Sequence, residues 1–367
     1  MGANQLLRNI KRGREGKNIG IPTGMSKLDA VTYGIQRRSL VVVAADQGSG
    51  KTSYSIASYV YNLYKNRGDK EVNILYYSFE MSGDTLFAKL LSLYIFDTFS
   101  KEITYETILS LTSPISDEDY DYIVKSEKWL FELEKVFTIY DKSLTPGGIF
   151  ATCKEWLKLH GEFVQVDEHK ENYIEHNSEA YKVVLVDHIG LVSGADTKKV
   201  RIDTTCDYLI YFRNKCNITG IIIQQINRNS KSVDRKLNGY ELLQLDDLSD
   251  SSATGQAAEV VLMIYYPYRE KVATCEGYPI QSTLKSRGRI IQVCKNRYGR
   301  SEVNVGASFF GEIGLFVELP QPKEITNYEV YTSLDKYREF KDQSNNLKTD
   351  ENEEYETDMT NDNVFKM

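Results

Sequence analysis

Cysteine is scarce in this chain, which has five Cys among 367 residues. The cysteines are scattered, and none forms a CxxC pair. This spacing argues against a zinc site and is typical of reduced thiols in a cytoplasm. The chain also lacks an apolar run of the roughly 20 residues that a membrane span needs. Its basic, polar N-terminus lacks the apolar core of a secretory signal. We therefore expect a cytoplasmic protein with no membrane association.

Positive charge is not in excess either, since the formal net charge is −7. A negative total argues at first against a nucleic-acid partner. The charge is unevenly placed, however, because residues 341–367 hold eight acidic residues and three lysines. Residues 1–17 instead carry five basic side chains and one acidic one. Local patches decide nucleic-acid binding more than the total does, so DNA remains a candidate partner.

The chain divides into four regions, and no internal repeat is present. These are a basic arm at 1–18, an α/β domain at 19–320, a peripheral segment at 321–340 and an acidic tail at 341–367. The arm has Leu6, Leu7 and Ile10 at helical spacing, which favours either a short helix or a frayed end. The tail has almost no apolar side chains, so we expect it to be disordered.

The central region has short, continuous apolar runs that are typical of strands covered on both faces. These runs are Leu40–Ala45, Asn73–Phe79, Val183–Val186, Gly220–Ile223 and Val260–Tyr265. Helical stretches separate them, which predicts an α/β fold with a twisted, mostly parallel sheet flanked by helices. Residues 161–181 are polar and acidic, and we expect them to form a solvated surface loop.

The most specific motif is a phosphate-binding loop between a predicted strand and a predicted helix. It reads Ala45-Asp46-Gln47-Gly48-Ser49-Gly50-Lys51-Thr52. Glycines let backbone N–H groups surround phosphate oxygens, and the helix N-terminus adds its positive end. Lys51 can reach the β- and γ-phosphates, and the Thr52 hydroxyl can ligate Mg²⁺. The predicted nucleotide-binding residues are Ala45, Gly48, Ser49, Gly50, Lys51, Thr52 and Ser53.

Two carboxylates follow other predicted strands. Asp187 ends the run Val183–Val186, where it can hold Mg²⁺ or simply cap the strand. Glu80 follows the run that ends at Phe79. It can polarise the water that attacks the γ-phosphate, or it can cap the next helix.

Five ordered motifs resemble those of the DnaB family of replicative helicases. They are Gly20-Ile21-Pro22-Thr23-Gly24-Met25-Ser26-Lys27-Leu28-Asp29, Phe79-Glu80-Met81-Ser82, Val186-Asp187-His188-Ile189-Gly190-Leu191, Gln225-Ile226-Asn227-Arg228 and Lys295-Asn296-Arg297-Tyr298-Gly299. Their order and spacing agree with the family over residues 19–318. The resemblance implies a RecA-like ATPase that moves 5′→3′ along single-stranded DNA and unwinds a fork, as a homo-oligomeric ring of six.

The resemblance also implies a role for each motif. Glu80 would be the catalytic glutamate, Asp187 the Mg²⁺ partner and Gln225 a sensor of the γ-phosphate. Lys295 and Arg297 would act on the neighbouring subunit's nucleotide, as a sensor and an arginine finger. Outside the family pattern, the favoured interpretation of this pair is solvated side chains on an amphipathic strand.

Two basic loops would line a central channel for DNA. The first follows Asp187 and covers residues 193–201, and the second follows Gln225 and covers residues 228–237. Neither contains an aromatic residue, so we expect them to follow the phosphate backbone without base stacking. Solvated loops are the alternative. The predicted DNA contacts are Lys198, Lys199, Arg201, Arg228, Lys231, Arg235, Lys236 and Asp250.

The chain also departs from the family pattern. His188 stands where Tyr is usual, and the family's Asp-Leu-Arg-Glu-Ser-Gly motif near DNA becomes Asp247-Leu248-Ser249-Asp250-Ser251-Ser252. We do not expect the family's N-terminal primase-interacting domain here. The chain would then be a truncated form that resembles those of phages. Candidate partners are a primase, a polymerase or a loader. Two alternatives stay open: a RecA-like recombinase or annealing ATPase, and a regulatory scaffold that assembles on nucleotide without unwinding.

Overall fold

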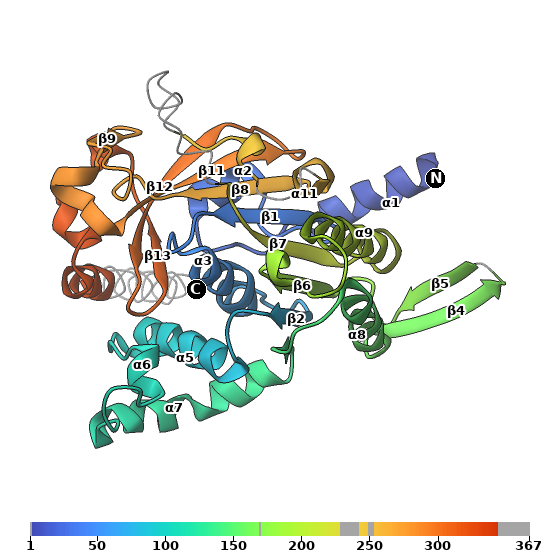
Figure 1. Ribbon diagram of the computed structural model, residues 1–367, viewed down its shortest axis with the longest axis horizontal. Helices are drawn as coiled ribbons and strands as arrows, with labels where there is room; N and C mark the ends of the chain where they lie inside the picture. The colour runs from blue at the N-terminus through green and yellow to red at the C-terminus, as the bar shows by residue number, and fades with distance from the viewer. Residues whose placement is uncertain (1, 169, 228–241, 249–252, 344–367) are drawn as a thin grey trace, which may run out of the picture.

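The computed structural model describes residues 2–168, 170–227, 242–248 and 253–343 (Figure 1). A nine-stranded sheet forms the centre, in the order β13-β12-β11-β8-β1-β7-β6-β2-β3. Its strands are β1 (Leu40–Ala45), β2 (Val72–Ser78), β3 (Phe137–Tyr140), β6 (Tyr181–Asp187), β7 (Thr219–Gln225), β8 (Val260–Tyr265), β11 (Gly288–Asn296), β12 (Val303–Phe310) and β13 (Leu315–Glu318). Two small antiparallel pairs are β4 (Gly161–Asp167) with β5 (Lys170–Glu175), and β9 (Thr274–Cys275) with β10 (Tyr278–Pro279).

Helices flank this sheet on both faces. The longer helical elements are α1 (Ala3–Arg14), α2 (Ser26–Thr32), α5 (Gly83–Phe99), α7 (Asp117–Glu134), α8 (Pro146–Lys158) and α9 (Lys198–Cys216). Shorter ones are α6 (Tyr105–Ile108), α11 (Ala253–Ala257) and the consecutive α3 (Lys51–Ile56), η1 (Ala57–Asn62) and α4 (Leu63–Lys65). No described helix is long and apolar enough to cross a membrane.

The sheet is parallel from β8 to β3 and antiparallel at its other edge. β1 pairs in parallel with both β7 and β8, whereas β11 pairs antiparallel with β8 and β12. The predicted α/β sheet is therefore confirmed. β1 and β8 have the predicted bounds, and the other three predicted strands differ from the structure by one or two residues at each end.

Two hydrophobic layers cover the faces of the sheet. Along β1, Val41, Val43 and Ala45 belong to one core, and Leu40, Val42 and Ala44 belong to the other. The alternation follows from the period of two in a strand. Tyr54 and Leu63 pack in the first core, and Trp156 and Phe212 pack in the second. Both faces are thus buried, which explains why the strands appear as unbroken apolar runs.

The predicted loop at residues 161–181 is wrong over most of its length, because β4 and β5 pair there as a hairpin. The hairpin projects to the right in Figure 1. Glu171 fastens it to the main domain through ion pairs with Lys154 at 2.9 Å and Lys215 at 3.5 Å. These partners come from α8 and α9, so the hairpin depends on contacts distant in sequence.

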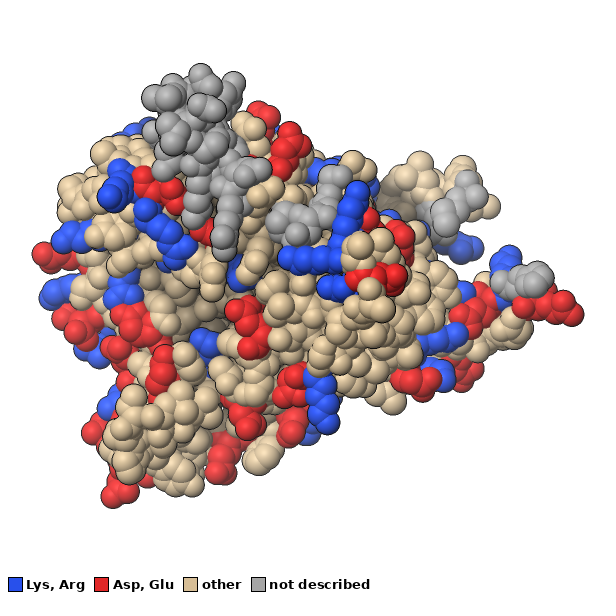
Figure 2. All heavy atoms as spheres, viewed as in Figure 1, with Lys and Arg blue, Asp and Glu red and all other residues tan. Residues whose placement is uncertain are grey.

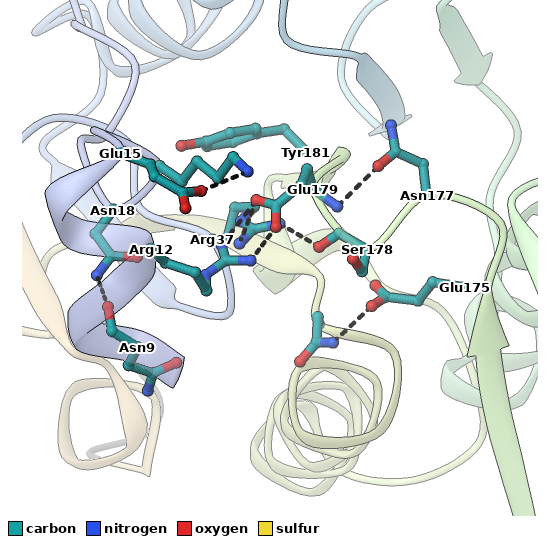
Figure 3. Close-up of polar contacts among 12 residues, drawn as sticks. Asn9, Arg12, Glu15, Asn18, Arg37, Glu175, Asn177, Ser178, Glu179 and Tyr181 are labelled. Atoms are coloured by element: carbon teal, nitrogen blue, oxygen red, sulfur yellow. Dashed lines mark hydrogen bonds and ion pairs between the residues drawn. The ribbon is translucent and has the colours of Figure 1, made fainter. Parts of the chain in front are cut away.

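The basic arm forms α1, as the helical alternative predicted. Figure 3 shows Arg12 of this helix directed at Glu179, which Arg37 also contacts. Leu6, Leu7 and Ile10 remain 61%, 61% and 52% exposed. The arm is therefore held to its own chain by charge, while its apolar stripe faces outward.

The segment after β13 packs back on the domain. Residues 334–343 are helical, and Leu334 and Tyr337 lie against Phe96 and Phe310. Lys341, which the sequence analysis placed in the tail, belongs to this helix. The rest of the predicted tail, residues 344–367, lies outside the described residues.

Candidate functional site

The phosphate-binding loop joins β1 to α3 at the carboxyl edge of the sheet. Gly48 and Gly50 have φ angles of 71° and 97°, which favour glycine. A Cβ atom on Gly50 would lie 2.9 Å from the Phe316 ring. Position 50 therefore requires glycine, because the backbone φ angle is positive and because a side chain would clash with Phe316.

Parallel pairing brings the two predicted carboxylates to this loop. Ser78, at the end of β2, is the ladder partner of Asp187, so Glu80 lies just beyond the same edge. The Thr52 Oγ1 atom lies 3.3 Å from Asp187 Oδ1, and Lys51 Nζ lies 4.0 Å from Glu80 Oε2. The structure thus places four of the predicted residues around one point.

Asp187 sits in a buried, hydrogen-bonded position. It is 1% exposed, and the Tyr76 hydroxyl donates to its Oδ2 at 2.7 Å. Burial raises the pKa of Asp187, although the hydrogen bonds from Tyr76 and Thr52 oppose that rise. A cation beside Thr52 would favour the ionised carboxylate, so this donor set fits Mg²⁺.

Lys51 and Glu80 differ in their access to solvent. The Lys51 side chain is 7% exposed, whereas the Glu80 side chain is 45% exposed. A water molecule can therefore reach the Glu80 carboxylate from solvent, whereas the Lys51 ammonium group is buried in the protein. A lysine that can contact a phosphate, with a solvent-accessible carboxylate beside it, suits attack by water on that phosphate.

Gln225 is the β7 partner of Ala45, so it also lies at the carboxyl edge. Beyond it, the Asn227 amide donates to the Asp247 carbonyl oxygen at 2.6 Å, and Ile226 bridges to Leu248. Gln225 therefore connects the phosphate-binding loop with the segment that carries the altered Asp-Leu motif.

Two arginines that the sequence analysis missed contact the phosphate-binding loop. Arg289 Nε donates to the Ser49 carbonyl oxygen at 2.9 Å, and Arg269 Nη1 lies 3.2 Å from Asp46 Oδ2. Arg289 is 3% exposed, and burial lowers its pKa to about 10. Its guanidinium carbon lies 3.6 Å from the ring centroid of Tyr266. The sequence signal that could have identified Arg289 is a basic residue beside the apolar run of β11.

Lys295 and Arg297 lie away from this chain's own phosphate-binding loop. Asn296 pairs with Val260 of β8, which pairs with Val41 at the start of β1. The loop follows Ala45, four residues or ~13 Å further along that strand. Lys295 and Arg297 are thus at the opposite edge of the sheet.

Carbonyl oxygens of α11 hold both side chains at that edge. Lys295 Nζ donates to Gly255 O at 2.8 Å and to Gln256 O at 2.7 Å. Arg297 reaches Glu259 Oε1 at 3.3 Å and Gln256 O at 3.0 Å, and its side chain is 52% exposed. Arg297 is therefore accessible to another molecule.

The first predicted DNA loop is partly helical. α9 begins at Lys198, and the Thr197 side chain caps it by accepting from the Val200 amide. The loop prediction is wrong from Lys198 onward, so Lys198, Lys199 and Arg201 lie in the first turn. Arg201 Nε donates to the Val192 carbonyl oxygen at 2.8 Å, so this side chain braces its own loop.

The remaining predicted DNA contacts lie outside the described residues. They are Arg228, Lys231, Arg235, Lys236 and Asp250. On the face seen in Figure 2, basic and acidic side chains are interspersed, and neither sign covers the surface.

The sheet and the convergent side chains define a P-loop NTPase with a RecA-like fold. The C-terminal domain family of DnaB-like helicases matches residues 20–318, and the chain belongs to that family.

Relatives with known names agree with this assignment. The replicative DNA helicase DnaB of Helicobacter pylori is 26% identical over 253 residues, which are 68% of this chain and 44% of that protein. DnaB of Geobacillus stearothermophilus is 38% identical over 90 residues, which are 24% of this chain and 19% of that protein. The chain thus spans less than half the length of these relatives.

Two solved structures share the fold. One, described as an ATPase domain, has a TM-score of 0.64 at 20% identity, with 87% of this chain and 99% of that chain covered. A DnaB-like replicative helicase, described with its interactions with primase, has a TM-score of 0.62 at 19% identity. Coverage is 87% of this chain and 67% of that chain.

Proposed function

We propose that this chain is the ATP-driven motor of a replicative DNA helicase, which moves 5′→3′ along single-stranded DNA and unwinds duplex at a fork. The observation that carries the proposal is the convergence of Lys51, Thr52, Glu80 and Asp187 at one sheet edge, in a member of the DnaB-like family. Such motors couple phosphate chemistry to loop movement, and in this proposal the loops after Asp187 and Gln225 provide that movement.

ATP with Mg²⁺ fits the site as the energy source, and bound Mg²⁺ neutralises developing phosphate charge. The amides of the phosphate-binding loop surround the phosphates, and Lys51 touches the transferred group. Thr52 and Asp187 hold the metal, which is consistent with their 3.3 Å separation. Glu80 orients the attacking water from the exposed side of the site.

Part of the active site belongs to the neighbouring copy in this proposal. Arg297 is exposed at the edge opposite the phosphate-binding loop, where it can meet the nucleotide of an adjacent subunit in a ring of six. Lys295 acts beside it as a sensor. Gln225, next to Ala45, senses the γ-phosphate and transmits its loss to the DNA loops.

In this proposal the two DNA loops bind the single-stranded DNA. Lys198 and Lys199 of the α9 first turn, with the basic residues after Gln225, contact phosphates without reading bases. We further propose a cytoplasmic setting, which the five free cysteines support. A primase, polymerase or loader is the proposed class of protein partner.

Strand displacement on a forked duplex tests the function. The wild-type chain should release the labelled strand only with ATP and Mg²⁺, and Lys51→Ala should release none. Strand pairing without displacement would instead identify an annealing ATPase or recombinase. Nucleotide-dependent assembly with neither reaction would identify a regulatory scaffold.

A further inference from the structure

A cleft of about 480 Å³ lies between α7 and the end of the helix that follows the phosphate-binding loop. Tyr61, Tyr94 and Trp129 line it, together with Lys125 and Lys128; we call it the Trp129 cleft. Tyr61 lies ten residues after Lys51, or ~15 Å along the helix. The Trp129 cleft is therefore separate from the nucleotide site.

The wall of the Trp129 cleft is aromatic. Tyr94 stacks on Trp129 with ring centroids 4.2 Å apart and planes 10° from parallel. The ring centroid of Tyr61 lies 6.0 Å from that of Trp129, and the two planes are tilted by 56°. Trp129 itself is only partly buried, so its indole is available to an occupant.

The rim of the Trp129 cleft carries surplus positive charge. Its two carboxylates are already engaged: Glu132 pairs with Lys135 at 2.6 Å, and Asp97 binds Lys65. Lys125 and Lys128 are exposed on α7. Within the described part of the chain, neither of them forms an ion pair. An acidic occupant would neutralise the positive charges of Lys125 and Lys128.

The described residues that precede the chain's own acidic segment contact the rim of the same cleft. Lys341 Nζ donates to the Asp97 carbonyl oxygen at 2.6 Å and lies 3.1 Å from Asp97 Oδ1. The Tyr61 hydroxyl donates to the other carboxylate oxygen of Asp97 at 2.6 Å. Residues 334–343 are thereby fixed beside the Trp129 cleft. The cluster 350–356 begins nine residues after Lys341, within a reach of ~30 Å for an extended chain.

We propose that the acidic segment 350–356 docks in cis into the Trp129 cleft. Its sequence, Asp-Glu-Asn-Glu-Glu-Tyr-Glu, provides five carboxylates for Lys125 and Lys128 and one tyrosine for the aromatic wall. The short tether raises its local concentration to about the millimolar range, so modest contacts suffice. A partner that captures the segment opens the Trp129 cleft, and salt weakens the docking.

Single-stranded nucleic acid is the rival occupant, because aromatic and basic side chains also suit it. The position of Lys341 favours the acidic segment, since Lys341 contacts Asp97 at the cleft and precedes that segment by only nine residues. The acidic segment predicts shielding of Trp129 that depends on the C-terminal residues, whereas nucleic acid predicts shielding that does not, so the two occupants are separable.

Tryptophan quenching by acrylamide, a neutral quencher, tests the docking. The chain has two tryptophans, and Trp156 is only 4% exposed, so Trp129 dominates the quenching. Removal of residues 344–367 should raise the Stern–Volmer constant by about twofold, because an occupant shields the indole from one side. High salt should produce the same rise in the full chain and none in the shortened one.

Matched variants localise the effect. Deletion of only residues 357–367, which keeps the acidic cluster, should leave quenching unchanged. Lys125→Glu with Lys128→Glu should raise quenching in the full chain and not in the shortened chain. Equal quenching of the full and shortened chains overturns the proposal. Protection by an oligothymidylate that is equal in both chains also overturns it and assigns the Trp129 cleft to nucleic acid.

Discussion

Arg289 donates from Nε to the carbonyl oxygen of Ser49 at 2.9 Å, and so connects β11 with the phosphate-binding loop. The same strand ends beside Arg297, which faces away from this site. β11 therefore joins the nucleotide site of its own chain to the residue proposed to act on the next one. If this strand shifted as one unit, both Arg289 and Arg297 would change position.

Replacement of Arg289 by Lys should weaken nucleotide binding about tenfold. Lysine keeps a charge but loses the planar contact with Tyr266 and the fixed Nε donor, and hydrogen bonds from charged groups contribute about 1.5–3 kcal/mol. Isothermal titration with a non-hydrolysable nucleotide would measure the loss. Arg269→Lys is the control, since that side chain is 39% exposed and should change affinity little. Unchanged affinity in Arg289→Lys would show that the loop holds its shape unaided.

Lys51→Ala and Glu80→Gln should separate binding from chemistry. Loss of Lys51 removes the buried cation at the phosphates, so binding or turnover should be abolished. Glu80→Gln keeps the shape and should bind nucleotide while hydrolysis falls by about 10²-fold or more. Filter binding and phosphate release measure the two steps. Normal turnover by Glu80→Gln would remove that residue from the catalytic role.

Asp187→Asn should stabilise the nucleotide-free chain at neutral pH while it abolishes Mg²⁺-dependent binding. Burial raises the pKa of Asp187, so the folded chain protonates this carboxyl more readily than the unfolded chain does. Its ionised form therefore opposes folding above the folded pKa, and that penalty disappears as pH falls through the pKa. The advantage of Asp187→Asn in thermal unfolding should shrink toward pH ~4.

A surface control accompanies this measurement. Asp196→Asn changes an exposed carboxylate and should leave the melting temperature unchanged at each pH. A lower melting temperature for Asp187→Asn at neutral pH would show that the Tyr76 and Thr52 hydrogen bonds outweigh burial.

The sequence predicted those parts of the site that depend on local pattern and on parallel pairing. β1 and β8 are buried on both faces, so their apolar runs matched the strand bounds. Glu80 comes just after β2 and Asp187 ends β6, and these two strands are parallel neighbours, which is why two distant motifs meet. The start of α9 was also available in the sequence, since Thr197 is a typical N-cap residue.

Other features depend on contacts that no local pattern records. Arg289 reaches Ser49 only because β11 pairs with β8, which lies beside β1. The β4–β5 hairpin carries many charges, and its attachment through Glu171 to Lys154 involves separate elements. Such long-range partners are set by tertiary structure, so the sequence alone predicted a loop there.

The N-terminal arm should support the assembly more than the single chain. Leu6, Leu7 and Ile10 are exposed, whereas Arg12 holds α1 on its own domain through Glu179. Deletion of residues 1–18 should therefore shift mass-photometry profiles toward smaller species, with little change in monomer melting. Changing the three apolar residues to Ser should give the same shift with the Arg12 contact intact. Identical oligomer profiles would show that the arm does not join subunits.

The proposal that the active site is shared between subunits gives the most direct test of the ring. Arg297 lies at the sheet edge opposite its own phosphate-binding loop, so it can complete a site only in an adjacent copy. Comparable arginine fingers contribute about 10³–10⁵ in rate. Arg297→Ala should then bind ATP nearly normally and hydrolyse it slowly. Mixing it with Lys51→Ala should restore activity, because some interfaces then pair an intact Lys51 with an intact Arg297. If mixed oligomers are confirmed by mass and activity stays absent, Arg297 does not act between subunits, and the ring mechanism built on it fails.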